Sequence, residues 1–595
     1  MLKRLTAILS FGFLLPAISV LGQQPDQIAT FRAKTDVVLV PVVVRSKKGP
    51  VEGLKAEQFT VTEDGKPQTV ASLEFIKTGG KVERKHPAGE FSNELTASNP
   101  ARLTIIAIDT INTPFLDQSF ARNQVLKYVA NSMEPNEQIA VLSMNRDGSV
   151  KLLHDITTDS AMLAKAIKGM TATAPGEVTD TKTTPRYSTV ELQTMIMGNN
   201  QNAGTGDPGL ALATQEAQAF QVFKESTGSE GAYELRRNME ATLSSMRQIT
   251  EAFAGAPGRK TFVWITGSFP FDITSSAELT SPKNYTYGIT GQDSSAYIAR
   301  NSVSGALPPL PESKIAINDE DMGPMRQEFR TLLQQLAAAN IVLYPVDARG
   351  LMTLNSEASD HNFNSILQQY DRERAQTSQT TMETMAAMTG GKTCYNKNEI
   401  TNCVHDASAD SDGYYLLSYS RDKKNNKPGW RRLSVKVDAP GADVRARTGY
   451  YYGSDSGDKN ARTRAINTAA RSSVPFTSVQ FSARFLDQSA EGNKKAVNYE
   501  IYVPPASVVS VMGPDNRFEL EFLAIAATPK DPKTDIVSEL VGKNLPPEAF
   551  AAIEKQGIAY KNKLKVAPGE YTVHFLVRNT ANNVVGSIIA PLTVQ

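Results

Sequence analysis

Patterns of apolar and polar residues typical of β-strands occur near both ends of the chain. Residues 36–45 form an almost continuous apolar run in which Pro41 favours an edge strand or a bulge. Asp64-Gly65 marks a tight hairpin turn a little further on. After a Pro-Gly turn, Tyr571, Val573, Phe575 and Val577 alternate with Thr572, His574, Leu576 and Arg578. These patterns predict antiparallel β-structure at both ends, including a C-terminal β-sandwich over residues 475–595.

The middle of the chain has a different pattern, in which short apolar runs alternate with helical periodicity. Strands separated by helices pair in parallel. We therefore predict a doubly wound, mostly parallel α/β sheet over residues 101–405. Residues 171–232 and 268–315 show little periodicity and are expected to be insertions at its rim, because long loops in compact domains are usually functional or disordered. The predicted strands are 103–109, 139–144, 150–153, 261–266 and 341–346.

Two short β segments, residues 30–78 and 412–452, flank this α/β region. Each is short for an independent domain, and the two ends of such an α/β domain lie close together. We therefore predict that the segments pair into one β unit into which the α/β domain is inserted. Residues 79–100 and 453–474 are polar and are expected to be linkers.

The first residues have the pattern of an export signal. Lys3 and Arg4 precede a mostly apolar run from Leu5 to Leu21, which predicts a cleaved signal peptide over residues 1–22. The alternative is a membrane anchor, which Pro16 and the shortness of the run disfavour. No later run reaches the ~20 apolar residues that span a bilayer. We expect an exported protein of the periplasm, the cell envelope or the medium, with no membrane span after cleavage.

Composition narrows the possible partners and the redox chemistry. The 595 residues include 63 Lys and Arg against 62 Asp and Glu, which argues against nucleic acid as a partner, because that would need a basic face. The chain has two cysteines, Cys394 and Cys403. Export favours a local disulfide between them, although two unpaired thiols are the alternative, since only geometry decides whether they can bridge.

The stretch from Leu103 to Thr113 carries the clearest candidate binding site. An apolar strand pattern ends at Asp109, small polar residues follow, and a helical pattern comes next. In open α/β folds ligands bind beyond the carboxyl ends of the strands. Asp109 and the residues after it are therefore expected to lie where a ligand would bind.

Several segments, by their order and spacing, resemble the von Willebrand factor A domain, and more closely the exported A-domain-related proteins of acidobacteria. The resemblance covers roughly residues 36–452. It implies a binding protein that acts through protein–protein contact or adhesion, with a protein partner that the sequence does not name. Because the residues show no catalytic constellation, we expect this binding protein to be non-enzymatic. The segments are Asp36 to Phe75, Asp109 to Phe115, Pro257 to Lys260, Ile265 to Pro270, Tyr414 to Tyr419 and Arg445 to Tyr450.

The family's metal site combines Asp-x-Ser-x-Ser after the first strand, a later Thr, and an Asp after the fourth strand. Asp109 matches the first Asp, and Thr113 matches the second Ser in its chemistry. Ile111 stands at the first Ser position and cannot ligate through its side chain. Thr242 is the best match to the later Thr. Thr266-Gly267-Ser268 stands where the family has Thr-Asp-Gly, so that carboxylate is missing.

The resemblance thus implies a degenerate metal site built from Asp109, Thr113 and Thr242. One clear carboxylate predicts at most weak binding of Mg²⁺ or another divalent cation, because Mg²⁺ gives up its water reluctantly. Asn112 and Ser268 are expected on the binding rim. The alternative is that Asp109 caps a turn and accepts backbone hydrogen bonds there.

Other chemistry is sparse in the sequence. The five histidines are scattered, and neither a His-Glu-x-x-His motif nor a Gly-x-Ser-x-Gly elbow occurs. Asp406, Asp410 and Asp412 are expected to be a solvated helix end, because their spacing is wrong for a calcium loop. Two further functions stay open: a structural envelope protein tethered by its C-terminal sandwich, and a hydrolase with an unrecognised site at the strand-end rim.

Overall fold

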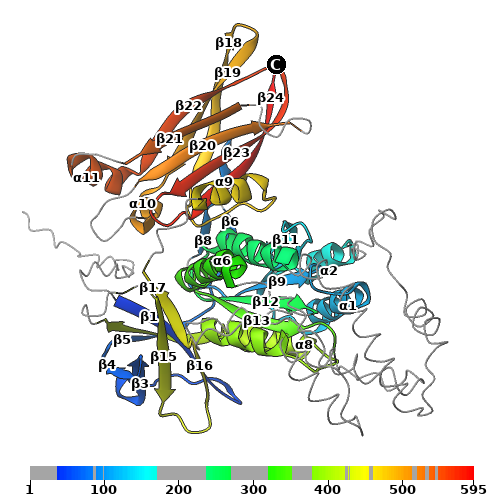
Figure 1. Ribbon diagram of the computed structural model, residues 1–595, viewed down its shortest axis with the longest axis vertical. Helices are drawn as coiled ribbons and strands as arrows, with labels where there is room; N and C mark the ends of the chain where they lie inside the picture. The colour runs from blue at the N-terminus through cyan, green and yellow to red at the C-terminus, as the bar shows by residue number, and fades with distance from the viewer. Residues whose placement is uncertain are drawn as a thin grey trace, which may run out of the picture.

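Figure 1 shows the computed structural model, with a β-sandwich at the top, a helix-covered sheet at the centre and a second β unit at the lower left. The predicted signal peptide lies outside the described residues. So do residues 171–232 and, apart from Phe269, residues 268–315. The described residues are 37–84, 89–97, 99–170, 236–267, 269, 319–350, 378–421, 427, 429–453, 460–511, 519–528, 535–542 and 547–595.

A five-stranded sheet in the order β11-β10-β9-β12-β13 forms the central layer. Four strands run parallel, and β11 is antiparallel to β10. The parallel strands are buried along their whole length, which is why their sequences are almost continuously apolar. The strands are β9 (Leu103–Asp109), β10 (Gln138–Met144), β11 (Val150–Thr157), β12 (Lys260–Thr266) and β13 (Ile341–Asp347).

The four parallel strands end at one side of this sheet, which we call the carboxyl edge. It contains Asp109, Met144, Thr266 and Asp347, the last residues of β9, β10, β12 and β13. Met144 pairs with Asp109, and Thr266 pairs with Asp347. The register therefore brings the ends of all four strands together.

Helices cover the sheet, and two separate apolar clusters form the core. One cluster joins α1, α2 and α8 to strand residues such as Ile106 and Ile108. The other joins the helices 236–253 and 378–389 and α6 to residues such as Ile105 and Ala107, which point the opposite way along the same strand. The labelled helices are α1 (Phe115–Asn131), α2 (Ser160–Lys168), α6 (Asp319–Ala338) and α8 (Thr401–Ala409).

Strands from before and after this layer form one β unit. Val40 of β1 lies opposite Leu417 of β14, and Val61 of β3 lies opposite Val435 of β15. The two sheets, β16-β1-β14-β5 and β17-β15-β3-β4, share one apolar cluster. The elements are β1 (Val37–Ser46), β2 (Gly49–Pro50), η1 (Ala56–Gln58), β3 (Phe59–Glu63), β4 (Lys66–Gln68), β5 (Val70–Lys77), β14 (Gly413–Ser420), β15 (Gly429–Val437), β16 (Asp443–Ala446) and β17 (Gly449–Tyr452).

A buried ionic cluster joins the β unit to the central layer. Asp410 follows α8 and is 1 % exposed. Its carboxylate accepts a hydrogen bond from Tyr344 at 2.8 Å and pairs with Arg445. Its carbonyl accepts a hydrogen bond from Arg259 at 3.0 Å. The prediction of a solvated helix end is therefore wrong for Asp410, because cationic side chains from distant segments surround it.

The C-terminal region consists of two four-stranded antiparallel sheets, β22-β19-β18-β7 and β21-β20-β23-β24, that share an apolar core. Strand β7 (Phe91–Ser92) comes from far upstream and pairs with β18. The other elements are β18 (Ser482–Glu491), β19 (Lys494–Val503), α10 (Pro505–Val511), β20 (Leu520–Ala527), β21 (Asp535–Val541), α11 (Pro547–Gln556), β22 (Ile558–Val566), β23 (Gly569–Asn579) and β24 (Val585–Val594).

The segments expected to be linkers contain regular structure. Residues 79–100 include β6 (Val82–Arg84), β7 and β8 (Leu95–Ala97), while residues 453–474 include α9 (Ala461–Arg471). Ala465, Ile466 and Ala469 of α9 pack against the core of the central layer. This apolar face is narrow and made largely of alanine, so the polar composition of the segment conceals it.

The expected fold class, a doubly wound and mostly parallel α/β protein, is wrong for this chain. In the described residues three strand pairs are parallel, all within the central sheet, and every other pair of strands is antiparallel. The prediction gave too much weight to the alternating strands and helices in the middle of the sequence. The antiparallel segments on either side contribute most of the strands.

Among the described residues, no helix combines the length and the apolar composition that crossing a membrane requires.

Candidate binding site at the carboxyl edge

Asp109 ends β9 and organises the turn that follows. Its side chain is fully buried. Carboxylate oxygen Oδ1 accepts hydrogen bonds from the backbone N–H groups of Ile111, at 2.7 Å, and Asn112, at 3.2 Å. A carboxylate that accepts from the backbone two residues on is the usual Asx turn. The first oxygen of Asp109 is therefore used to shape the loop.

The second oxygen of Asp109 accepts hydrogen bonds from three side chains, one in the loop after β9 and two in β12. Oδ2 accepts from Asn112 Nδ2 at 2.9 Å, Thr266 Oγ1 at 2.8 Å and Trp264 Nε1 at 3.2 Å. The carboxylate thus accepts five hydrogen bonds, although it offers about four lone-pair positions. The acceptor capacity of Asp109 is saturated.

Asn112 connects Asp109 to the helix 236–253. Its amide nitrogen also donates to Thr242 Oγ1 at 2.8 Å. The Thr242 hydroxyl gives its own proton to the carbonyl of Asn238 at 2.7 Å, so it accepts from Asn112. Both neighbours of the amide nitrogen are acceptors, and this determines which way round the amide lies.

Thr113 connects the same loop to the end of β12. Its hydroxyl accepts the backbone N–H of Gly267 at 2.8 Å, and its carbonyl accepts from Gln118 at 2.8 Å. Gly267 is closely packed: a Cβ added there would lie 2.9 Å from both the Thr113 Cα and the Pro114 Cδ. No side chain fits at position 267 unless the 112–114 backbone moves.

Burial dominates the electrostatics of the cluster. It raises the pKa of the Asp109 carboxyl above its ordinary value, and hydrogen bonds from Asn112 and Thr266 partly oppose this effect. Desolvation penalises the charged form, whereas donors aimed at the carboxylate favour it. The surrounding donors are therefore what makes an ionised Asp109 tolerable at this depth.

These residues do not fit the divalent cation that the A-domain resemblance implies. Among the described residues, no group of three or more His, Cys, Asp or Glu side chains is placed to hold a metal ion. Ile111 is 2 % exposed and belongs to the apolar core. Position 267 has no room for a second carboxylate. The side-chain nitrogen of Asn112, which donates hydrogens and offers no lone pair to a cation, lies between Asp109 and Thr242.

The structure brings four of the predicted site residues together, namely Asp109, Asn112, Thr113 and Thr242. Ser268 lies outside the described residues. Trp264 and Thr266 both donate to Asp109 but were not among the predicted site residues. Thr266 could have been found, because it ends a buried strand that is parallel to β9. Nothing in the sequence distinguishes Trp264, which lies within the apolar run of β12 like an ordinary core residue.

A second charged group at this edge also went unnoticed in the sequence. Asp347 ends β13 and forms a two-point ion pair with Arg349, with distances of 2.9 and 2.7 Å. Burial raises the pKa of Asp117 in the first turn of α1, and the charge of Arg349 opposes this rise. The carboxyl edge therefore presents acidic and basic side chains close to the Asp109 cluster.

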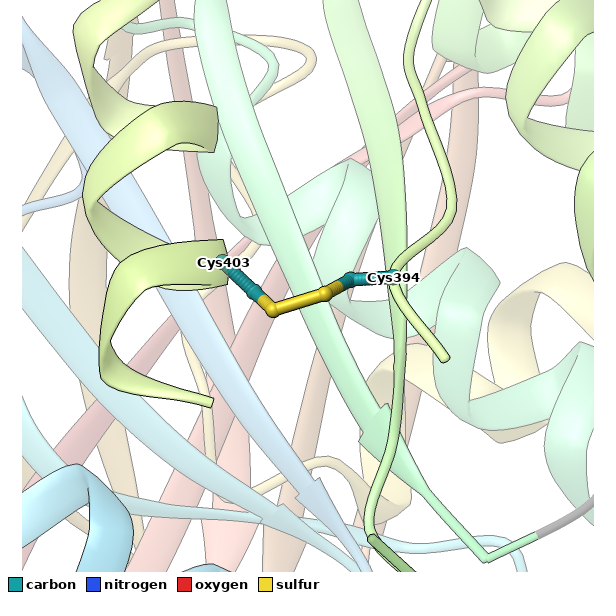
Figure 2. Close-up of a disulfide and its surroundings, with 2 residues drawn as sticks. All are labelled: Cys394 and Cys403. Atoms are coloured by element: carbon teal, nitrogen blue, oxygen red, sulfur yellow. A yellow bond between two sulfur atoms is a disulfide. The ribbon is translucent and has the colours of Figure 1, made fainter. Parts of the chain in front are cut away.

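A disulfide joins Cys394 to Cys403 of α8, with the two Cα atoms 6.0 Å apart (Figure 2). Cys394 lies beside β13. Its backbone N–H donates to the carbonyl of Pro345 at 2.9 Å, and its carbonyl accepts from the backbone N–H of Asp347 at 2.8 Å. The disulfide therefore links α8 to the segment that borders the last strand of the central sheet.

A comparison with models of known protein families found no match, and a search of curated proteins found no relative.

Proposed function

We propose that this protein is a non-enzymatic binding protein that contacts a protein partner at the carboxyl edge of its central sheet. The hydrogen-bonding network of Asp109 is the observation that carries this proposal. A general acid or base must reach its substrate by a hydrogen bond. Asp109 is fully buried, and five donors already occupy its acceptor positions. Its role is to hold the loop in shape, and an ordered loop at a strand end suits recognition.

The surface around the cluster supports binding. Pro114 is exposed, and Asn112, Asp117 and Arg349 are partly exposed. Strand ends are where open sheets with parallel strands place their ligands. Polar and charged side chains are typical of the solvent-accessible rim of a protein–protein interface. A protein partner uses such a surface without needing a deep pocket.

Export and the resemblance to A-domain-related proteins belong to the same proposal. A disulfide persists in oxidising compartments, and Cys394 and Cys403 are bonded. This supports a location in the periplasm, at the cell envelope or in the medium. The resemblance leads us to expect contact with another protein. The five hydrogen bonds to Asp109, which order its loop, support the carboxyl edge as the contact surface.

Matched arginine substitutions in the full-length protein test the proposal. Pro114→Arg places a long charged side chain beside the Asp109 loop. Leu486→Arg places the same side chain on β18, where Leu486 is 45 % exposed. Each protein would be crosslinked to extracts of the exported fraction, and the captured partner would be identified by mass spectrometry. Thermal unfolding would first show that both variants are folded.

We expect one partner to be captured by the wild type and by Leu486→Arg and to be lost with Pro114→Arg. The opposite result, capture by Pro114→Arg and loss with Leu486→Arg, would place the contact on the sandwich and favour the structural envelope function. Equal capture by all three proteins would exclude the carboxyl edge as the contact surface.

A further inference from the structure

We infer that the side-chain amide of Asn112 takes the place of a bridging cation, so that the carboxyl-edge loop is held in its final shape by direct hydrogen bonds. The inference does not depend on the proposed function, because cation binding is measured without a partner. It predicts that one side chain decides whether this edge responds to divalent metal ions.

The position of the Asn112 nitrogen is the first argument. It lies 2.9 Å from Asp109 Oδ2 and 2.8 Å from Thr242 Oγ1. A carboxylate from one segment and a hydroxyl from another are the oxygen ligands that a hard cation prefers. Here an NH₂ group stands between them and gives one hydrogen to each. Two N–H donors thus supply positive partial charge to the same two oxygens.

Direct hydrogen bonds between the ends of β9 and β12 independently support the inference. An ion that bridges two loops would hold them at the distance set by its ligands. In this protein the loops touch: the Gly267 N–H donates to Thr113 Oγ1 at 2.8 Å, and the Thr266 hydroxyl donates to Asp109 at 2.8 Å. The absence of a side chain at Gly267 is what permits this approach.

The occupied acceptor positions of Asp109 also disfavour a cation at this site. A divalent cation would approach one carboxylate whose acceptor positions already carry five hydrogen bonds. To bind, the cation would have to displace the Asn112 amide. It would gain only two oxygen ligands, Asp109 Oδ2 and Thr242 Oγ1. Mg²⁺ dehydrates reluctantly, so this exchange is unfavourable. Replacing the amide by an oxygen ligand removes the competition and adds a ligand at the same time.

The experiment uses thermal unfolding of the full-length protein with EDTA and with millimolar Mn²⁺ or Mg²⁺, together with calorimetric titration. A ligand that binds the native state raises the unfolding temperature. We expect no change for the wild type and a clear rise with Mn²⁺ for Asn112→Asp. Asn112→Ser is the second variant, since it removes the amide donors without adding charge. Asn582→Asp, at an exposed turn, is the matched control and should stay unresponsive.

Two outcomes would overturn the inference. One is a rise in the unfolding temperature of the wild type with Mn²⁺ that disappears in Asp109→Asn, because the edge would then bind a cation despite the amide. The other is a folded Asn112→Asp protein and a folded Asn112→Ser protein that both ignore Mn²⁺, since the amide would then not occupy a cation position.

Discussion

At the scale of single residues, the carboxyl edge depends on very close packing between β9 and β12. Gly267 is in contact with the backbone of the loop that Asp109 shapes. Glycine is used where two stretches of backbone must approach closely. The hydrogen bond from Gly267 to Thr113 exists because nothing stands between them. One missing side chain therefore matters as much to this site as the carboxylate does.

Gly267→Ala should destabilise the protein by about 1–3 kcal/mol, the range for an overpacked interior. Its Cβ would lie 2.9 Å from backbone and ring atoms of Thr113 and Pro114, which must then move. Chemical unfolding monitored by circular dichroism measures the change. Gly79→Ala is the control, because a Cβ there has open space and the change should stay within about 0.5 kcal/mol. An equal effect of both substitutions would contradict the packing argument.

At the scale of elements, α8 and the segment beside β13 form a small covalently closed unit. The disulfide links cysteines nine positions apart. Cys394 is also paired with the strand through two backbone hydrogen bonds. Asp410, which follows α8, enters the ionic cluster that holds the β unit. Fixing α8 thus helps to position both the sheet and its neighbour.

Replacing both cysteines by alanine should reduce the free energy of unfolding by about 2–3 kcal/mol. The disulfide closes a short loop in the unfolded chain, so the bonded chain has less conformational entropy to lose on folding than the variant has. Urea unfolding of the wild type and the double variant measures the difference. A reducing agent should lower the stability of the wild type towards that of the variant and leave the variant unchanged. Sensitivity of the variant to the reductant would point to a cause other than this bond.

At the scale of the whole molecule, a buried carboxylate lies where the sandwich meets the central layer. Glu251 accepts a hydrogen bond from Gln335 of α6 at 2.7 Å, and the N–H of Val585 in β24 lies 3.5 Å away. The carbonyl of Glu251 accepts the N–H of Thr477, which precedes β18, at 2.7 Å. Burial raises the pKa of Glu251 to about 7. The junction therefore contains an acid that titrates near neutral pH.

Stability should fall as the pH rises from about 4.5, the ordinary pKa of a glutamate, to about 7, the pKa of Glu251 in the folded protein. In this window the folded state binds the proton more tightly than the unfolded state does, so raising the pH favours unfolding, by a loss on the order of 3 kcal/mol. Urea unfolding at pH 5 and pH 8 measures the change. Glu251→Gln should remove this part of the pH dependence, and an unchanged dependence would contradict the assignment.

The strands of the central sheet and their order along the chain could be predicted from the sequence, because buried parallel strands are continuous apolar runs. The predominance of antiparallel strand pairs in the whole fold could not be predicted. Strand pairing between distant segments, such as Val40 with Leu417, leaves no local trace, and the small apolar face of α9 is hidden in a polar segment. The location of Asp109 at a strand end was likewise visible, and Thr266 could have been placed beside it as the end of a parallel strand, whereas nothing in the sequence pointed to Trp264.

The sequence by itself determined that a lone aspartate closes an apolar strand, and that Ile111 and Gly267 leave the expected ligand set incomplete. Only the tertiary structure decided what takes the place of the missing ligands. Asn112 meets a threonine 130 positions away, and Gly267 brings two loops into contact. The physical reason is that local pattern determines burial and turns, whereas hydrogen bonds between distant segments depend on how the layers pack.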